Sequence, residues 1–427
     1  LVTGLFTDPN PGGHYDVPQL LLTDALLQAL SEDCCYGVYA PRTASSPATE
    51  DLMLRTGFLP GPKIVFTKFT IFRAACQSFP LPQELGGRPL MLVDMRAPVA
   101  LIQNIPTTLK EPLASDRTVL EAVQQAHVRF QSAITGLYPG TLALSFNAEV
   151  IYHRLVRKIV EANGVPAEPT HPRVLGPKMC VPFGKILRGN AIPNTVTKTI
   201  HTDKVFAPDL RSFSIEAFPG YAPLESQIRT IRSFRRPVIL VDDLLDSSNR
   251  FQALDPLFRR YGVSVDRVLV GLMSARGRDL MEARGVAADC VYFVPNLRAW
   301  FVESTLYPFI GGDTVSGVKP SVPGLTPAIN LILPYAFPNF YKECGRQAVY
   351  RFSRTCIANS HDILAALEAA YREQFSRNLT LSRLNEAVIL PLSPDKGNCL
   401  AYDSNLPASA CLENDLLTLR RMRNVLE

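Results

Sequence analysis

The stretch PVILVDDLLDSSNR, residues 237–250, carries the strongest structural signal in this chain of 427 residues. It starts with four apolar residues, 238–241, a run typical of a strand that is buried on both faces of a parallel sheet. Two carboxylates, Asp242 and Asp243, end the run, and a short polar turn leads to a predicted helix at 250–261. Because ligands of α/β proteins bind beyond the carboxyl ends of the strands, this order predicts a ligand site at the turn.

The polar turn has the chemistry to hold a phosphorylated sugar. Backbone N–H groups in such a turn can bind a phosphate, and the partial positive charge at a helix N-terminus adds to this attraction. The two carboxylates can hold sugar hydroxyls, either directly or through a magnesium ion. A buried strand that ends in a solvated acidic turn, with no ligand at all, gives the same residue pattern and stays an alternative.

At these residues the chain resembles the type I phosphoribosyltransferases. Their signature is an apolar strand, two acids, two apolar residues and a loop rich in Thr, Ser and Gly, and residues 241–247 follow this order without a gap. The 6-oxopurine phosphoribosyltransferases have the most similar version, because they have a third acid at the position of Asp246. The resemblance spans about residues 140–313 and implies binding of phosphoribosyl pyrophosphate or a nucleoside monophosphate, with Mg²⁺ as cofactor.

The resemblance also implies a role for each residue of the motif. Asp242 and Asp243 would bind the ribose hydroxyls and the metal ion, and Asp246 would be the catalytic residue that exchanges a proton with the nucleobase. Arg188 and Gly189 partly match the family's pyrophosphate loop, since Arg can grip phosphate oxygens with two N–H groups. The cradle for the 5′-phosphate would consist of Ser247, Ser248, Asn249 and Arg250.

The phosphate cradle departs from the family pattern. The family usually has Gly at the position of Ser248, often a second Gly at Asn249, and Thr at Arg250. Glycine permits a positive φ and a close approach of the backbone to the ligand, which Ser permits only with strain. Binding of a phosphorylated sugar is therefore better supported than turnover, and a non-catalytic, ligand-sensing or regulatory protein stays an alternative.

Two further segments fall at places where the family binds its substrates. His201 and Lys204 lie in the region of the family's mobile catalytic loop, and 311–313 is expected to form a close turn near the ligand. Such loops close over the substrate and exclude water. The alternatives are a surface histidine without a role at His201 and, for Arg188 and Gly189, a plain glycine turn with a solvated arginine.

The alternation of elements predicts an α/β fold with a mainly parallel sheet of phosphoribosyltransferase type. After the motif, strands are expected at 267–273 and 290–295, with a helix at 276–284 between them. The length of the chain predicts two or three domains. We expect a smaller α+β unit at 1–110, a phosphoribosyltransferase-like domain at 111–315 and a mostly helical C-terminal region at 316–427.

The N-terminal unit has a weaker resemblance to the back half of the GNAT acetyltransferase fold. The shared features are a helix that ends in Arg-x-Gly-Phe, 55–58, and a following strand that ends in Met. In that family this helix lies beside the acetyl-CoA site. A multidomain acyl- or nucleotidyl-transferase, with its chemistry in or before this unit, is therefore a second alternative. In the C-terminal region we expect helices around 340–356, 361–375 and 412–425.

Composition narrows the class of protein. The net charge of +5 is small and no nucleic-acid-binding module is recognisable, so we expect no nucleic-acid partner. Nine cysteines without a Cys-x-x-Cys pair argue against a disulfide framework and a zinc ribbon, and favour the cytoplasm. No apolar run approaches the ~20 residues of a membrane helix, so no membrane partner is expected. The chain begins at Leu1 rather than Met, and we expect a homo-oligomer or part of a larger multidomain assembly.

Overall fold

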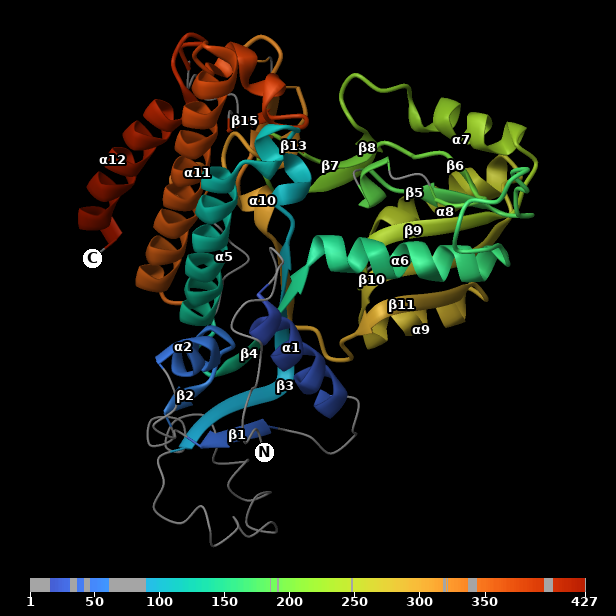
Figure 1. The fold of residues 1–427 in the computed structure, drawn as a ribbon, viewed down its shortest axis with the longest axis horizontal. Coiled ribbons are helices and arrows are strands. Elements are labelled where there is room, and N and C mark those ends of the chain that lie inside the picture. Colours follow the sequence, from blue (N-terminus) through green and yellow to red (C-terminus); the bar gives the residue numbers. More distant parts are fainter. Residues whose placement is uncertain are drawn as a thin grey trace, which may run out of the picture.

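The fold is a mixed α/β arrangement of sheets and long helices, as predicted (Figure 1). Three sheets of five strands each are present among the described residues, and one of them is parallel throughout. In Figure 1 this parallel sheet lies on the right and the longest helices lie on the left. The computed structural model describes residues 16–30, 37–41, 47–60, 90–184, 186–189, 192–246, 249–317, 320, 322–336, 344–394 and 402–426.

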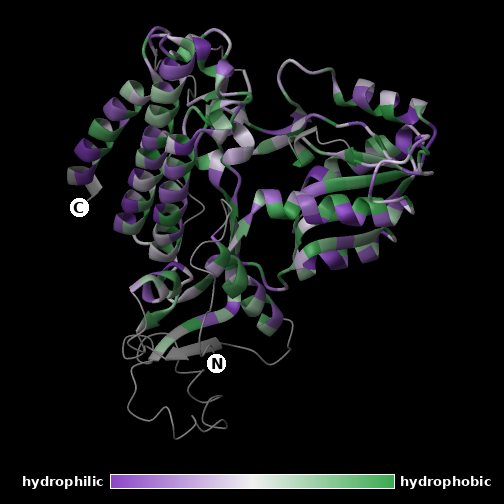
Figure 2. Ribbon diagram, viewed as in Figure 1, coloured by the Kyte–Doolittle hydropathy of each residue, from purple (hydrophilic) through white to green (hydrophobic). Residues whose placement is uncertain are grey.

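The parallel sheet has the strand order β11-β10-β9-β5-β6 and contains the motif of residues 237–250. The apolar residues 238–241 are fully buried, which confirms the predicted strand. Figure 2 shows the same apolar character along the neighbouring strands. The strands are β5 (Met179–Pro182), β6 (Val196–Thr197), β9 (Val238–Leu245), β10 (Val265–Met273) and β11 (Ala287–Phe293).

Helices accompany the parallel sheet. They are α6 (Ala148–Asn163), α7 (Leu224–Ser233), α8 (Asn249–Arg260) and α9 (Ala275–Ala283). Among them, α8 and α9 confirm the predictions at 250–261 and 276–284. The side chain of Asn147 accepts hydrogen bonds from the N–H groups of Glu149 and Val150, so it caps α6 at its start. Gly164 ends the helix with a φ of 65°, a conformation that glycine adopts without strain. Local sequence signals thus define α6, which packs on β10 and β11.

A second sheet is built around β3 (Leu90–Gln103), which pairs with four other strands. β1 (Gly37–Pro41) and β2 (Leu59–Pro60) run antiparallel to β3, whereas β4 (Thr141–Asn147) and β12 (Ala299–Val302) run parallel to it. The sheet therefore combines strands from both sides of the expected boundary at residue 110. The division into domains stays a prediction, while the pairing shows that elements cross its first boundary.

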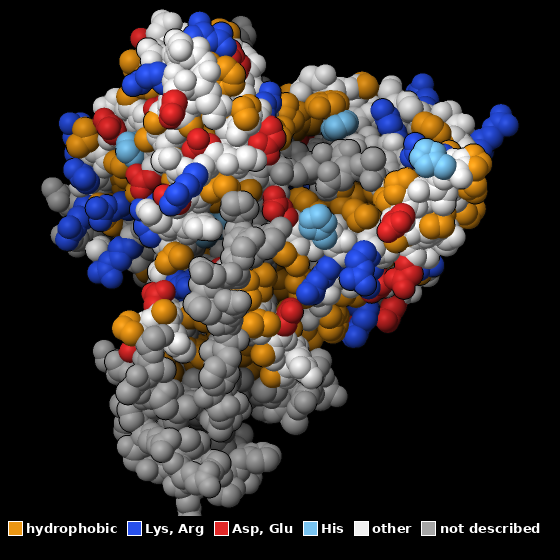
Figure 3. All heavy atoms as spheres, in the orientation of Figure 1, with side chains coloured by type: hydrophobic (Ala, Val, Ile, Leu, Met, Phe, Trp, Pro, Cys, Tyr) orange, Lys and Arg blue, Asp and Glu red, His pale blue; other side chains and the backbone are white. Residues whose placement is uncertain are grey.

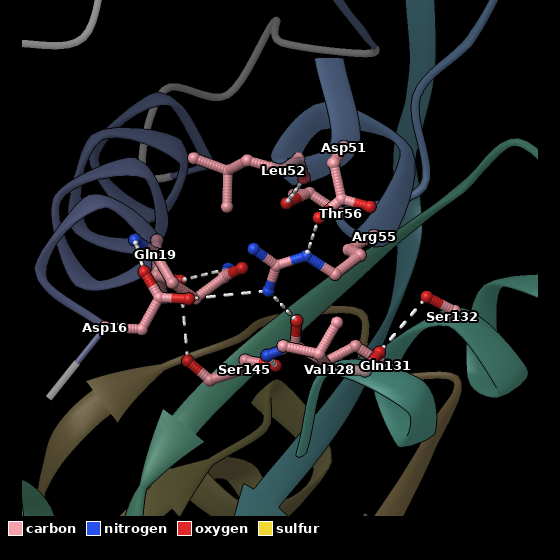
Figure 4. A network of polar contacts seen from close by, with 11 residues as sticks. Asp16, Gln19, Asp51, Leu52, Arg55, Thr56, Val128, Gln131, Ser132 and Ser145 are labelled. Atoms are coloured by element: carbon pink, nitrogen blue, oxygen red, sulfur yellow. Dashed lines mark hydrogen bonds and ion pairs between the residues drawn. The ribbon is translucent and has the colours of Figure 1, made fainter. Parts of the chain in front are cut away.

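A buried polar network also spans that boundary (Figure 4). Arg55, the last residue of α2 (Pro47–Arg55), donates to Asp51 at 2.8 Å and to Gln131 of α5 (Arg117–Leu137) at 2.6 Å. Gln131 donates in turn to Ser145 of β4 at 3.0 Å. The arginine of the Arg-x-Gly-Phe pattern thus connects α2 with α5 and β4. The other N-terminal helix, α1 (Val17–Leu30), packs on β4 as well.

The third sheet has the order β15-β14-β13-β7-β8. β7 and β8 form an antiparallel hairpin in the part of the chain between the two predicted site motifs, and β13 joins β7 in parallel. In Figure 1 β7 and β13 lie between the helical part and the parallel sheet. The strands are β7 (Thr202–Phe206), β8 (Phe213–Ala217), β13 (Asp313–Val315), β14 (Thr326–Ile329) and β15 (Leu392–Ser393).

The C-terminal region contains two long helices, α11 (Arg346–Phe375) and α12 (Ala408–Leu426), and α11 packs on α5. The prediction of separate helices at 340–356 and 361–375 was wrong, because α11 is continuous across the expected break. Its polar residues there are buried and paired: Asn359 donates to the Ala126 carbonyl at 2.9 Å, and Ser360 donates to the Pro308 carbonyl at 2.6 Å. No helix in the described part of the chain is long and apolar enough to cross a membrane.

Candidate functional site

The candidate site lies where the parallel sheet changes its direction of winding. From β5 the chain first adds β6 on one side and later β9 on the other, and β5 and β9 are direct neighbours. Such a switch point leaves a crevice beyond the carboxyl ends of the two strands. Pro182 of β5 pairs with Val241, so Asp242 and Asp243 lie at the same edge as the segment that follows β5.

That following segment carries the predicted pyrophosphate-binding residues. Arg188 and Gly189 belong to the 3₁₀ helix η4 (Ile186–Gly189), which lies against β9. The structure therefore brings the backbone of the Arg-Gly pair to the same edge as the two aspartates. The roles of Arg188 and Gly189 toward a ligand stay a prediction.

Arg250 is the residue whose position departs most from the expected one. It lies in the first turn of α8, and its Nη1 donates a hydrogen bond to Asp242 Oδ1. The same nitrogen lies 3.8 Å from Asp243 Oδ1, and the guanidinium carbon is 5.7 Å from the ring centroid of Phe183, just beyond β5. The cation expected in the phosphate cradle thus pairs with the carboxylates expected to hold the sugar.

The charges around Asp242 do not balance. Burial raises the pKa of the Asp242 carboxyl well above its usual value, the Arg250 guanidinium opposes this, and the neighbouring Asp243 adds to the rise. Arg250 also interacts electrostatically with Asp203, on β7. One arginine thus serves three carboxylates.

A fourth carboxylate, Asp313, lies close to this group. Burial raises the pKa of Asp313 to about 6, although Lys204 and Arg250 lower it. Lys204 Nζ is 3.9 Å from Asp313 Oδ2, and Asp203 accepts a hydrogen bond from Thr314. Lys204 lies on β7 and Asp313 is the first residue of β13, so the segments that were expected to form a loop and a turn meet as two paired strands. Asp203 was missed by the sequence analysis, since nothing in its local sequence distinguishes it from a surface aspartate.

Asp246, the predicted catalytic residue, is bound by residues at the start of α9 and not by Arg250. It is buried, and it accepts hydrogen bonds from Ser274 Oγ at 2.7 Å and from Arg276 Nη2 at 3.0 Å, one on each carboxylate oxygen. A Cβ at Gly277 would lie 2.1 Å from the Leu245 carbonyl oxygen, so α9 packs directly against the end of β9. Both oxygens of Asp246 therefore have partners within the protein.

The rest of the predicted phosphate cradle is only partly described. Ser247 and Ser248 lie outside the described residues. Asn249 is the first residue of α8, so its backbone N–H belongs to the helix terminus that the sequence pattern expects to face a phosphate. The binding of a 5′-phosphate by these residues stays a prediction.

The arrangement does not fit the predicted magnesium ion. Mg²⁺ takes oxygen ligands in near-octahedral geometry, usually one or two carboxylates with several waters. Here Asp242 Oδ1 already accepts a hydrogen bond from a guanidinium, and the same guanidinium nitrogen lies 3.8 Å from Asp243 Oδ1. No cluster of three or more His, Cys, Asp or Glu side chains suited to a metal ion occurs among the described residues.

Comparison with known proteins gives limited information. No protein-family model matches the chain, and no curated protein matches it. Among solved structures, the chain is similar to a hypoxanthine phosphoribosyltransferase mutant from Trypanosoma cruzi complexed with the product IMP. The identity is 13%, the match covers 38% of this chain and 76% of that chain, and the TM-score is 0.20. A likeness at this level carries no argument about fold or function, and the resemblance to GNAT acetyltransferases finds no support in these comparisons.

Proposed function

We propose that this protein binds a phosphorylated ribose, either phosphoribosyl pyrophosphate or a nucleoside monophosphate, at the carboxyl edge of β5 and β9. The observation that carries the proposal is the position of the Asp242–Asp243 pair at the switch point of the parallel sheet, beside η4 and the start of α8. This crevice is the general ligand position of open α/β sheets.

In this proposal, different residues at this edge bind different parts of the ligand. The side chain of Asp243 is 36% exposed, so its carboxylate can accept hydrogen bonds from the ribose hydroxyls. Backbone N–H groups at the start of α8 suit the 5′-phosphate, helped by the helix dipole. Arg188, on η4, would hold a further phosphate.

Transfer of the phosphoribosyl group to a nucleobase-like acceptor is the second candidate function. Asp313 favours it, because a carboxyl with a pKa of about 6 exchanges protons readily near neutral pH. The predicted proton carrier, Asp246, weighs against it, because Ser274 and Arg276 already pair with both of its oxygens. Ligand binding without turnover is therefore the function that we favour.

Isothermal titration with phosphoribosyl pyrophosphate tests the proposal. We expect the wild type to bind with a Kd of about micromolar order, and the Asp242→Asn/Asp243→Asn variant to bind at least about 100-fold more weakly, since two charged hydrogen-bond acceptors are lost. Asp266→Asn is the matched control, because Asp266 lies at the start of β10, at the opposite edge of the same sheet.

The outcomes separate the candidate functions. No binding by the wild type, or equal binding by the double variant, would contradict the proposal. If binding occurs, release of pyrophosphate in the presence of nucleobases decides between a binding protein and a transferase. Release that is lost in Asp313→Asn would favour the transferase.

A further inference from the structure

The position of Arg250 raises the question of which cation serves the Asp242–Asp243 pair. Its guanidinium donates to Asp242 and lies within ion-pair distance of Asp243, at the place where a divalent cation would have to bind both carboxylates. We infer that Arg250 takes the place of the divalent cation at this site, so that the phosphorylated ribose binds without Mg²⁺. This inference rests on the proposed function and concerns how the same site is neutralised.

Arg250 is fixed in this position by its surroundings. It projects from the first turn of α8, and its guanidinium lies near the Phe183 ring beyond β5. It therefore lies at the carboxyl ends of both β9 and β5. An arginine stays protonated at all pH values relevant to proteins, so it cannot leave the carboxylates by losing its proton.

The site has more carboxylates than cations, but the position of the Arg250 guanidinium keeps a divalent ion away from Asp242. Arg250 interacts with Asp203, Asp242 and Asp243, and it also lowers the pKa of Asp313. A divalent ion on Asp242 would stand next to the guanidinium, where like charges repel strongly at short distance. The ion could bind only if Arg250 moved away, which would leave its guanidinium to find another partner for its charge.

The Nε–H group of Arg250 can donate a further hydrogen bond to a ligand. Its Nε is buried and has no hydrogen-bond partner among the described residues. A phosphate or hydroxyl oxygen that enters the crevice can accept this hydrogen bond while Nη1 stays on Asp242. Arg250 is therefore assigned two contacts, one to the protein and one to the ligand.

Two measurements on the full chain test this inference. Electron paramagnetic resonance with Mn²⁺ alone reports whether the carboxylates hold a divalent ion. Titration with ribose 5-phosphate, in Mg²⁺ and in EDTA, reports whether binding of the sugar needs one. The variants are Arg250→Met, which removes the charge, Arg250→Lys, which keeps it, and Arg260→Met, an exposed arginine at the other end of α8, as the matched control.

We expect no specific Mn²⁺ site in the wild type, in Arg250→Lys or in Arg260→Met. Arg250→Met should gain one Mn²⁺ site, and Asp242→Asn in that background should abolish it. The affinity of the wild type for ribose 5-phosphate should change by less than about threefold between Mg²⁺ and EDTA, which corresponds to little or no coupling between the two ligands.

The inference is overturned if the wild type holds a Mn²⁺ ion that Asp242→Asn removes, or if EDTA weakens sugar binding by about tenfold or more. If Arg250→Met does not fold, the wild type and Arg250→Lys still decide. Failure of the wild type to bind either ribose 5-phosphate or phosphoribosyl pyrophosphate, with or without Mg²⁺, would remove the proposed function and, with it, binding without Mg²⁺. The Mn²⁺ measurements would still show whether Arg250 occupies the cation position.

Discussion

Each edge of the parallel sheet has an aspartate beside basic side chains, buried at the carboxyl edge and partly exposed at the amino edge, and the charges are arranged in opposite ways. At the amino edge, Asp266 accepts hydrogen bonds from Lys178 Nζ at 2.7 Å and from Arg267 Nε at 2.9 Å, so two cations serve one acid. At the carboxyl edge, Arg250 pairs with Asp242 and lies near Asp243, so one cation serves at least two acids.

The pKa values of the two aspartates follow from this difference. Burial tends to raise the pKa of Asp266, but hydrogen bonds from Lys178 and Arg267 lower it below its usual value. Burial raises the pKa of Asp242 well above its usual value, and Arg250 does not offset the combined effect of burial and Asp243. Groups with strongly shifted pKa values gather at functional sites, so the comparison distinguishes a stabilising ion pair from a site that is short of positive charge.

The largest effect is expected from Arg250→Met. Removal of one partner from a mostly buried ion pair leaves an uncompensated charge, so we expect the free energy of unfolding to fall by about 3 kcal/mol at neutral pH. Urea denaturation measures this change. The folded pKa of Asp242 already exceeds its unfolded value and should rise further in the variant, so the stability lost at neutral pH should recover as the pH is lowered and the carboxyl takes up a proton. A loss that does not depend on pH would show that Arg250 acts through packing alone.

Much of the fold could be predicted because its signals are local. The structure confirms the buried run 238–241, and this run, the Asn147 cap and the Gly164 stop each depend on a few neighbouring residues. The unpredicted features depend on distant partners. β3 pairs with β12, which lies about 200 residues further along the chain and has no sequence mark of that pairing. The unbroken α11 likewise depends on Ala126 and Pro308, far away in the sequence.

The candidate site shows the same limit. The sequence predicts that the strand ends at Asp242 and Asp243, whereas β9 continues through both residues to Leu245, and Asp246 follows it. The partner of each carboxylate could not be predicted. Arg250, in the helix that follows the strand, donates to Asp242, whereas Arg276, in the next helix, donates to Asp246. A strand motif thus predicts the edge at which residues lie, but their partners depend on how the following helices pack.

A smaller effect is expected from Asp313→Asn, and it should depend on pH. Asp313 lies close to Lys204 and Arg250 at the carboxyl edge. Its folded pKa is about 6, above the unfolded value of about 3.9. The folded state therefore binds more protons than the unfolded state between these values, and stability falls as the pH rises from about 4 to about 6. The ionisation of Asp313 lowers the free energy of unfolding by at most about 3 kcal/mol over this pH range.

The measurement is the free energy of unfolding across this pH range for the wild type and Asp313→Asn. The variant should lose that part of the slope, because Asn cannot ionise. Asp415→Asn is the matched control from the helical region: the Asp415 carboxyl accepts a hydrogen bond from Tyr335 at 2.6 Å, and burial raises its pKa to about 6 as well. If the free energy of unfolding becomes less dependent on pH only in Asp415→Asn, the lack of positive charge around Asp242 does not extend to Asp313.

The smallest effect is expected at the amino edge, from Lys178→Met. The variant removes one of the two cations of Asp266, and Arg267 remains as a partner, so the free energy of unfolding should fall by only about 0.5–1 kcal/mol at neutral pH. The folded pKa of Asp266 lies below its unfolded value, so the contribution of this carboxylate is present above about pH 4 and is lost as the pH falls further. Lys178→Met should therefore lose its effect in acid, whereas Arg250→Met should be mildest there and become more severe as the pH rises. Equal losses for the two Met variants at neutral pH, with the same pH dependence, would mean that the charge balance of the two edges does not differ.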